Sequence, residues 1–223
     1  MTRLDQWVHE RVPEDTDLDR PALSRLAVEL GGQPRFWKRF VRHDPNSRHF
    51  VQLYRDPHLD LYLICWLNAQ DTGYHDHDLS SGAVYVCEGT LNEDYFGRDP
   101  DGWIREKTQE HPAGSVFDFD SSYIHGVRHS SGPPATSVHA YSPALWRMGH
   151  YEPDDSGAVR RVPITYADEL ASALPPARAG TPSARRPAVS AATERSAAKR
   201  RAAPDARRRP ARRTRKPRAQ GHC

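Results

Sequence analysis

The chain has 223 residues, which is the length of one ordinary domain. It has no apolar stretch of roughly 18 or more residues, and its N-terminus is charged, so the sequence predicts neither a membrane span nor a secretory signal. The three cysteines are too few and too scattered for a disulfide framework. We therefore expect a cytoplasmic protein, and we expect a monomer.

The net charge of +3 conceals two parts of opposite charge. Residues 175–223 hold 15 of the 32 Lys and Arg but only 2 of the 29 Asp and Glu, so this tail carries +13 and the rest of the chain −10. The tail is rich in Ala, Arg and Pro and nearly devoid of large apolar residues, which predicts disorder. Because it also lacks aromatic residues that stack on bases, an extension without a role in the chemistry is the simpler interpretation. Nonspecific binding to nucleic acid or another polyanion is the alternative.

Helix signals fill the first 48 residues. Asp19-Arg20-Pro21 begins one helix, apolar residues follow it with helical spacing, and Gly31-Gly32 ends it. A shorter helix is expected over residues 3–12, and a further helical turn over residues 36–41. We expect this N-terminal helical segment, residues 1–48, to pack on the domain that follows.

From residue 49 the pattern changes to short β-like runs separated by Gly- and Pro-rich turns. Many short strands with regular turns predict a sandwich or a barrel, and the chain lacks the alternation of helices and strands that builds a parallel sheet. The sequence therefore predicts a mainly β domain over residues 49–165. The expected strands are residues 50–54, 61–67, 74–77, 83–87, 90–96, 103–106, 115–119, 125–128 and 136–141.

His75-Asp76-His77 is the most informative feature of the chain. Two histidines at alternate positions of a strand point to the same face, whereas Asp76 points away from it. Imidazole is the commonest protein ligand of a functional transition metal. His125 lies downstream in a similar context, and a metal held by these three side chains would keep other positions open for chemistry.

The spacing of these residues resembles the two sequence motifs of the cupins. His75 and His77 are followed by Gly82, and in the second motif Gly114 precedes His125. The resemblance implies a double-stranded β-helix, or jelly-roll, barrel with a metal inside its mouth. Gly82 stands where cupins usually have a glutamate ligand, so three neutral histidines would leave the ion its full charge and favour an anionic ligand such as a thiolate.

The chain is most similar to the thiol dioxygenases of the cupin superfamily, in particular to bacterial cysteine dioxygenases. The resemblance runs from Arg55 to Pro143 and is carried by Ile64-Cys65-Trp66, by the three histidines and by residues 137–143. It implies an enzyme that uses Fe(2+) to add both atoms of O2 to the sulfur of L-cysteine, forming cysteine sulfinate, a step of cysteine metabolism and taurine biosynthesis.

Ser137, His139 and Tyr141 occupy alternate positions, so a strand would present all three to one face. In the family, such residues lie next to the iron: His139 would hold Tyr141, Ser137 would steer His139, and the tyrosine hydroxyl would contact bound substrate or an oxygen intermediate. Considered alone, Tyr141 would be a strand aromatic and His139 a satisfied core histidine. The three metal-ligand candidates favour the catalytic interpretation.

Arg55 is the expected partner of the substrate carboxylate, because a guanidinium fork binds a carboxylate through two hydrogen bonds. Gln52 is the alternative, since mercaptopropionate dioxygenases usually have a glutamine at the corresponding position. Arg55 as an exposed surface charge is the plainer interpretation. We interpret His111 and His150 as surface or structural residues, and His129 as either a loop residue or one that supports the metal ligands.

The expected partners are a small-molecule thiol and O2, with no membrane. Two other functions stay open at this point. A three-histidine site also suits a zinc hydrolase that activates water. A cupin without catalytic activity could instead work through its basic tail by binding polyanions.

Overall fold

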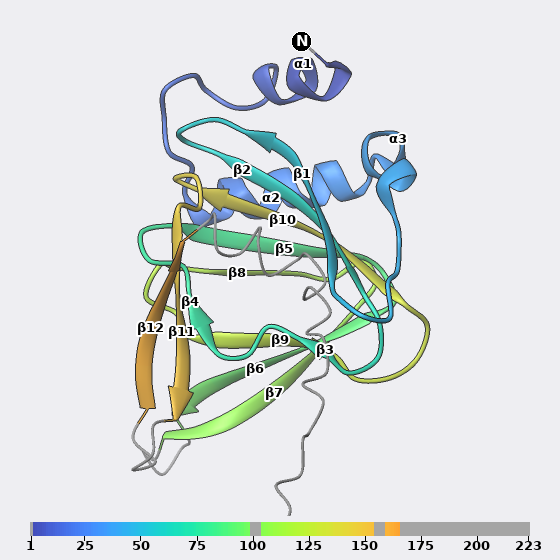
Figure 1. Cartoon of the computed structure of the whole chain (residues 1–223). Helices are drawn as coiled ribbons and strands as arrows, with labels where there is room; N and C mark the ends of the chain where they lie inside the picture. Colours follow the sequence, from blue (N-terminus) through green and yellow to red (C-terminus); the bar gives the residue numbers. More distant parts are fainter. Residues whose placement is uncertain (1, 99–103, 154–158, 166–223) are drawn as a thin grey trace, which may run out of the picture. The chain divides into compact units, whose positions relative to one another are not determined.

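The computed structural model describes residues 2–98, 104–153 and 159–165, and shows a barrel of strands with helices along one side (Figure 1). The predicted disordered tail, residues 175–223, lies outside the described residues. No helix in the described ranges is both long and apolar enough to span a membrane. The helical elements are α1 (Arg3–His9), α2 (Arg20–Gly31), α3 (Pro34–Trp37) and the 3-10 turn η1 (Lys38–Phe40). The strands are β1 (His49–Arg55), β2 (Asp60–Trp66), β3 (Gln70–Asp71), β4 (His75–Asp76), β5 (Ser81–Glu88), β6 (Thr90–Arg98), β7 (Ile104–Pro112), β8 (Val116–Phe119), β9 (His125–His129), β10 (Ala135–Ser142), β11 (Arg147–Pro153) and β12 (Val159–Thr165).

Helix α2 begins and ends where the sequence predicts. The side chain of its N-cap, Asp19, accepts a hydrogen bond from the backbone N–H of Ala22 at 2.8 Å, and a proline occupies its first turn. At its C-terminal end α2 comes very close to β5, because a Cβ on Gly31 would lie 2.1 Å from the ring of Tyr85. Gly31 therefore both ends the helix and allows it to pack tightly on the sheet.

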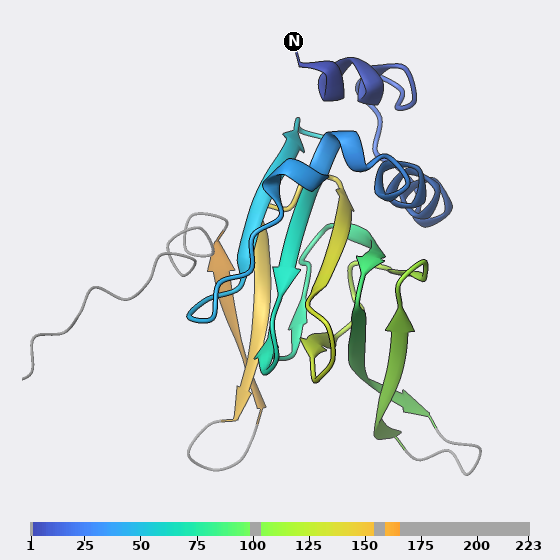
Figure 2. The same cartoon turned by 90° about the vertical axis from the view of Figure 1, so that its right-hand side faces the viewer.

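The strands form two antiparallel sheets that face each other across the barrel interior (Figures 1 and 2). One has five strands in the order β1-β2-β10-β5-β8. The other has seven, with β12-β11-β4-β9-β6-β7 in a row and β3 paired to β9. Because spatial neighbours such as β2 and β10 lie far apart in sequence, the topology is that of a jelly roll. The fold is the mainly β, double-stranded β-helix barrel that the sequence predicts.

Some strands differ from the predicted ones. Strands β11 and β12 were not expected, and β7 continues six residues past its predicted end at residue 106. β7 is mostly polar, β12 contains two adjacent arginines and a proline, and both are mostly exposed, so neither shows the apolar–polar alternation that marks a half-buried strand. They form because β7 pairs along its whole length with β6, and β12 with β11. In contrast, the strand expected over residues 74–77 is confined to His75–Asp76.

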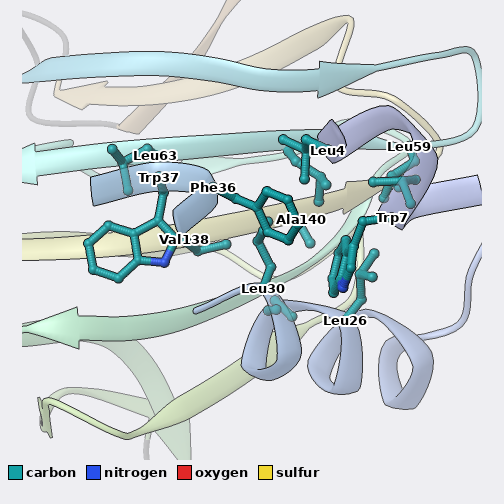
Figure 3. Packing of buried hydrophobic residues seen from close by; sticks show 14 of the residues in the cluster. Leu4, Trp7, Leu26, Leu30, Phe36, Trp37, Leu59, Leu63, Val138 and Ala140 are labelled. Carbon is teal, nitrogen blue, oxygen red and sulfur yellow. The ribbon is translucent and has the colours of Figure 1, made fainter. Parts of the chain in front are cut away.

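The central strands of the five-stranded sheet are buried on both faces. On β10, Val138 and Ala140 belong to the apolar cluster under the helices, whereas the alternate residues point into the barrel. Figure 3 shows this outer cluster between the helices and the sheet. Its labelled members are Leu4, Trp7, Leu26, Leu30, Phe36, Trp37, Leu59, Leu63, Val138 and Ala140. Since most of the apolar core lies outside the barrel, the interior is left free for polar side chains.

Candidate metal centre

His75, His77 and His125, here called the histidine trio, meet on the inner wall of the barrel. His75 lies in β4 and is paired in register with His125 at the start of β9, while His77 follows β4 directly. One ligand nitrogen from each residue lies within 4.8 Å of the others. All three are buried, with exposed fractions of 4%, 1% and 1%. The short β4–β9 pairing therefore brings together residues about fifty positions apart.

Hydrogen bonds show which nitrogens of the trio are available to a metal. The carbonyl of Gly73 accepts a hydrogen bond from His75 Nδ1–H at 3.1 Å, and the carboxylate of Glu93 accepts one from His125 Nδ1–H at 2.8 Å. Both contacts direct the ring lone pair to Nε2. Among the described residues, neither ring nitrogen of His77 has a hydrogen-bond partner, although the ring is buried. A metal ion would satisfy this orphaned imidazole, so the donor set fits a transition-metal ion.

Burial also keeps His75 and His77 in the protonation state that binds a metal. It lowers the pKa of His75 and His77 well below the ordinary value of 6.5, and the neighbouring histidines lower it further. A neutral imidazole carries the lone pair that coordinates a cation, whereas an imidazolium does not. The neutral rings of His75 and His77 can therefore coordinate a metal cation.

The position of the usual cupin glutamate is closed by an aromatic ring. A Cβ on Gly82 would lie 2.3 Å from the ring of Phe119 and 3.1 Å from the ring of Tyr141. Phe119 stacks on His77, with ring centroids 4.4 Å apart, and also contacts His125 at 4.6 Å. A fourth protein ligand therefore cannot come from position 82 without displacing Phe119.

A buried carboxylate that the sequence analysis missed lies behind the trio. Glu93, in β6, is 4% exposed and accepts hydrogen bonds from His125 Nδ1–H at 2.8 Å and from His111 Nε2–H at 3.1 Å. Burial alone would raise the pKa of Glu93, but these two hydrogen bonds lower it below the ordinary value. His111 is buried too and stacks on Phe117. The sequence did contain a signal for the burial of Glu93, because Leu91 and Glu93 occupy alternate positions and so share the inward face of β6.

Ser137, His139 and Tyr141, here called the relay, share the inward face of β10, as the alternation predicts. Ser137 Oγ lies 2.8 Å from His139 Nε2, and His139 Nδ1 lies 3.1 Å from the Tyr141 hydroxyl. Burial lowers the pKa of His139 to about 3, so the ring is neutral and has a single N–H. The indole N–H of Trp66 donates to Ser137 Oγ at 2.9 Å. In one polarity that satisfies all these contacts, Ser137 donates to Nε2 and His139 Nδ1–H donates to Tyr141.

The trio and the relay open into one cavity. The ring of Tyr141 lies against His77 at 5.3 Å, and both residues line the cavity wall. Apolar side chains of β1, β2, β5, β11 and β12 form most of the remaining wall, and two cations, Arg48 and Arg147, also lie on it. Arg48 Nη1–H donates to the carbonyl of Asp71 at 2.5 Å, and the guanidinium lies over Trp66 at 5.1 Å.

Arg55, the expected partner of the substrate carboxylate, is not among the residues that line this cavity. Its guanidinium pairs with the fully buried carboxylate of Asp60 and donates to the carbonyl of Leu145 at 3.2–3.3 Å. The reason is local: the β1–β2 register shifts between Gln52 and Tyr54, which changes the alternation before Arg55 is reached. The guanidinium of Arg55 is therefore directed toward Asp60 rather than into the cavity that the trio lines. Gln52 does not line the cavity either, and its amide donates to Asp60 at 2.9 Å.

Asp76 points away from the trio, as expected, and anchors the C-terminal hairpin. Its carboxylate accepts hydrogen bonds from Arg161 Nε and Nη2 at 2.6 and 2.7 Å and from the Tyr151 hydroxyl at 2.8 Å. Gly149 lies between the partners: a Cβ there would be 2.2 Å from Arg161 Nε and 2.6 Å from the carboxylate of Asp76. The guanidinium thus occupies the space of a missing side chain. The contact holds the hairpin, which supplies Ile164 to the cavity wall, against the segment that carries two metal-ligand candidates.

Two further histidines complete the surroundings. His150 is half-buried, and its ring lies 6.0 Å from that of His75. His129 is buried, and its Nε2–H donates to the carbonyl of Pro133 at 2.9 Å. His129 therefore ties the end of β9 to the following loop, away from the trio.

Comparison with known proteins gives one family. A family model described as cysteine dioxygenase type I matches residues 12–153. A search of curated proteins finds no match. Solved structures similar to the chain include TT1209 from Thermus thermophilus, with 22% identity, a TM-score of 0.41 and coverage of 48% of this chain and 92% of that one. A cupin superfamily protein from Desulfitobacterium hafniense has 7% identity, a TM-score of 0.41 and coverage of 60% and 96%. BH2720 from Bacillus halodurans has 19% identity, a TM-score of 0.40 and coverage of 64% and 90%.

Proposed function

Because the chain belongs to the cysteine dioxygenase type I family, we propose that it is an iron(II)-dependent dioxygenase that converts L-cysteine and O2 into cysteine sulfinate. One observation carries the proposal: the histidine trio and two residues of the relay, His139 and Tyr141, line the same cavity. The trio comes from β4, the residues after it and β9, and the relay comes from β10. The fold therefore places a candidate metal centre beside a candidate hydrogen-bond donor.

The proposed reaction needs only a thiol and O2. Both oxygen atoms become bonded to sulfur, so that R–SH and O2 give R–SO2H; sulfur is oxidised and O2 is reduced, and no further reductant is required. Bound Fe(2+) would supply the positions at which thiolate and O2 meet. The trio would hold it through neutral nitrogens. The positive charge retained at such a site favours binding of the substrate as a thiolate.

The relay would orient the substrate at the trio. Because His139 donates to the Tyr141 hydroxyl in the polarity described above, the hydroxyl itself acts as a donor. Its ring lies against His77, which places this donor at the edge of the candidate metal site. Ser137 and Trp66 fix the ring of His139 from behind, so Tyr141 keeps its orientation without rearrangement.

Arg48 is the residue that we propose for the substrate carboxylate. It lines the cavity, and its guanidinium is oriented by the carbonyl of Asp71 and the ring of Trp66. A guanidinium fork is suited to a carboxylate. Arg147 also lines the cavity, and its guanidinium donates to the carboxylate of Asp78 at 2.9–3.1 Å.

A thiol without the amino group, such as 3-mercaptopropionate, is the second candidate substrate. It keeps both groups for which the cavity has a partner, the thiol and the carboxylate. The described cavity wall contains no Asp or Glu that would recognise the ammonium group of cysteine. Discrimination between the two thiols would then depend on the metal and on cavity shape.

A substrate panel tests the assignment. On iron-loaded protein we expect oxidation of cysteine to its sulfinate, and a kcat/KM at least tenfold lower for cysteamine, which lacks the carboxylate. Arg48→Gln should lower kcat/KM for cysteine by about 10–100-fold, the value of a charge-assisted hydrogen bond, and leave cysteamine unchanged. Arg147→Gln is the matched control, with a smaller effect expected. No sulfinate from any thiol would contradict the proposed function, and equal losses for both substrates in Arg48→Gln would remove Arg48 from its role.

A further inference from the structure

We infer that Glu93 is a positioning residue that supplies, from behind His125, the negative charge that this cupin-type metal site lacks at Gly82. The inference rests on the metal site of the proposed function and extends it to the residues that support the ligands. It explains two observations together. The ring of Phe119 closes the usual ligand position at Gly82, and a buried acid, Glu93, lies outside the cavity wall.

A carboxylate side chain cannot occupy position 82, the usual ligand position of a cupin glutamate. Phe119 occupies the space beside Gly82 and stacks on His77, so its ring supports one metal-ligand candidate while it excludes a glutamate. A divalent ion in the trio would therefore meet three neutral side chains and no compensating charge among them. Such an ion is bound less tightly than one with a carboxylate ligand.

Glu93 has the opposite problem, since it is a buried acid whose ion-pair partners are histidines rather than permanently charged cations. Burial of an ionised carboxylate costs several kcal/mol unless a positive charge and hydrogen bonds compensate for it. Among the described residues, the ion-pair partners of Glu93 are only His111 and His125, and neither Lys nor Arg reaches it. A cation bound at Nε2 of His125 would place the missing positive charge on the far side of the same imidazole ring.

The geometry allows this charge to act through the ring. Glu93 Oε1 accepts from His125 Nδ1–H at 2.8 Å, a distance typical of a charge-assisted hydrogen bond. Its other oxygen accepts from His111 Nε2–H at 3.1 Å, so the carboxylate is held on both sides. Contacts of this kind fix the tautomer and orientation of a metal-binding histidine and raise its basicity. The Nδ1–H of His75 donates to a backbone carbonyl and not to a carboxylate, so His125 would bind the metal most strongly of the three.

The experiment compares metal affinity in Glu93→Gln and Asp94→Asn. Glu93→Gln removes the charge and keeps the shape, whereas Asp94→Asn removes a charge on the next residue, which pairs with Arg128. Anaerobic titration with Fe(II) against a chromophoric chelator should give about 10–100-fold weaker binding in Glu93→Gln and wild-type affinity in Asp94→Asn. The absorption spectrum of the Co(II)-loaded protein should change only in Glu93→Gln. Unchanged Fe(II) affinity and Co(II) spectrum in a folded Glu93→Gln protein would overturn the inference.

A second measurement needs no variant and keeps the inference testable if Glu93→Gln does not fold. In the Zn(II)-loaded wild-type protein, the Nδ1 proton of His125 should give a downfield NMR signal that is protected from exchange and couples to a ring whose Nε2 is bound to the metal. Absence of that protonated Nδ1 would also overturn the inference. Thiol oxidation is judged separately: a wild type that binds Fe(II) tightly but oxidises no thiol loses the proposed function, and the role of Glu93 stands.

Discussion

At the scale of single residues, burial lowers the pKa of His75, His77 and His139 and so keeps these rings uncharged. His139 is the clearest case, because its pKa is lowered to about 3 and it has hydrogen-bond partners on both nitrogens. A neutral ring is what the relay requires, since an imidazolium could not accept a hydrogen bond from Ser137. Burial therefore leaves one ring nitrogen of His139 able to accept a hydrogen bond within the relay.

This burial predicts a pH dependence of stability. In the unfolded chain a histidine titrates near 6.5, whereas folded His139 titrates near 3, so the unfolded state binds the proton first as pH falls. The contribution of this residue is thus fully present above pH 6.5 and is lost as pH falls toward 3, by about 1.4 kcal/mol per pH unit. We expect urea unfolding of metal-free His139→Gln to depend on pH less steeply than wild type, by about that amount, between pH 6 and 4. Parallel curves for the two proteins would contradict the assignment.

The site residues that the sequence predicted are those with a short-range pattern. His75 and His77 alternate, as do Ser137, His139 and Tyr141, and alternation survives in any strand. Glu93 and Arg48 do not share a motif with the residues that they accompany, so only the pairing of distant strands brings them to the site. Arg55 was selected from its place near the end of a β-like run, and the β-bulge that turns it toward Asp60 is not encoded in a local signal.

At the scale of elements, the β11–β12 hairpin closes one side of the cavity. It contributes Arg147, Met148, Ile164 and Thr165 to the wall, and Arg161 anchors it to Asp76. Residues 159–165 lie beyond the part of the chain that matches the family model. Strand β12 is mostly exposed, and its position depends on β11 and on an ion pair rather than on an apolar face, which explains why it was not predicted.

The absence of a side chain at Gly149 allows a test of whether Arg161 anchors the hairpin by filling that space. Gly149→Ala would place a methyl group 2.2 Å from Arg161 Nε, so either the ion pair or the strand must move. We expect a loss of about 1–3 kcal/mol in the free energy of unfolding, and a smaller loss when Arg161→Gln is already present. Gly32→Ala, whose Cβ would meet only ordinary contacts from 3.4 Å, is the control. Equal losses from Gly149→Ala in both backgrounds, measured by urea unfolding, would show that Arg161 does not fill the gap.

At the scale of the whole molecule, the apolar core and the site lie on opposite faces of the same sheet. Leu63 and Val138 pack under the helices, and the residues next to them in sequence, Ile64 and His139, line the cavity. Composition and periodicity predicted a mainly β sandwich or barrel with a helical segment packed on it, and the resemblance to cupins implied the barrel. The order of strands in the two sheets was not predictable from periodicity, because it depends on pairings between distant segments.

The charge division of the chain gives a prediction for the basic tail, which lies outside the described residues. Deletion of residues 175–223 removes a segment of charge +13 and leaves a body of charge −10. We expect the shortened protein to keep its thiol-dependent O2 uptake and to lose retention on immobilised heparin at low salt. If O2 uptake falls with the deletion while the protein stays folded, the tail has a part in catalysis that the present account does not give it.

The most direct test of the central claim is oxidation of L-cysteine by the iron-loaded protein under ¹⁸O2, with the product analysed by mass spectrometry. The account predicts cysteine sulfinate with both oxygen atoms labelled, and neither product nor bound iron in His125→Ala. A product with a single labelled oxygen, a disulfide as the only product, or full activity in His125→Ala would contradict it.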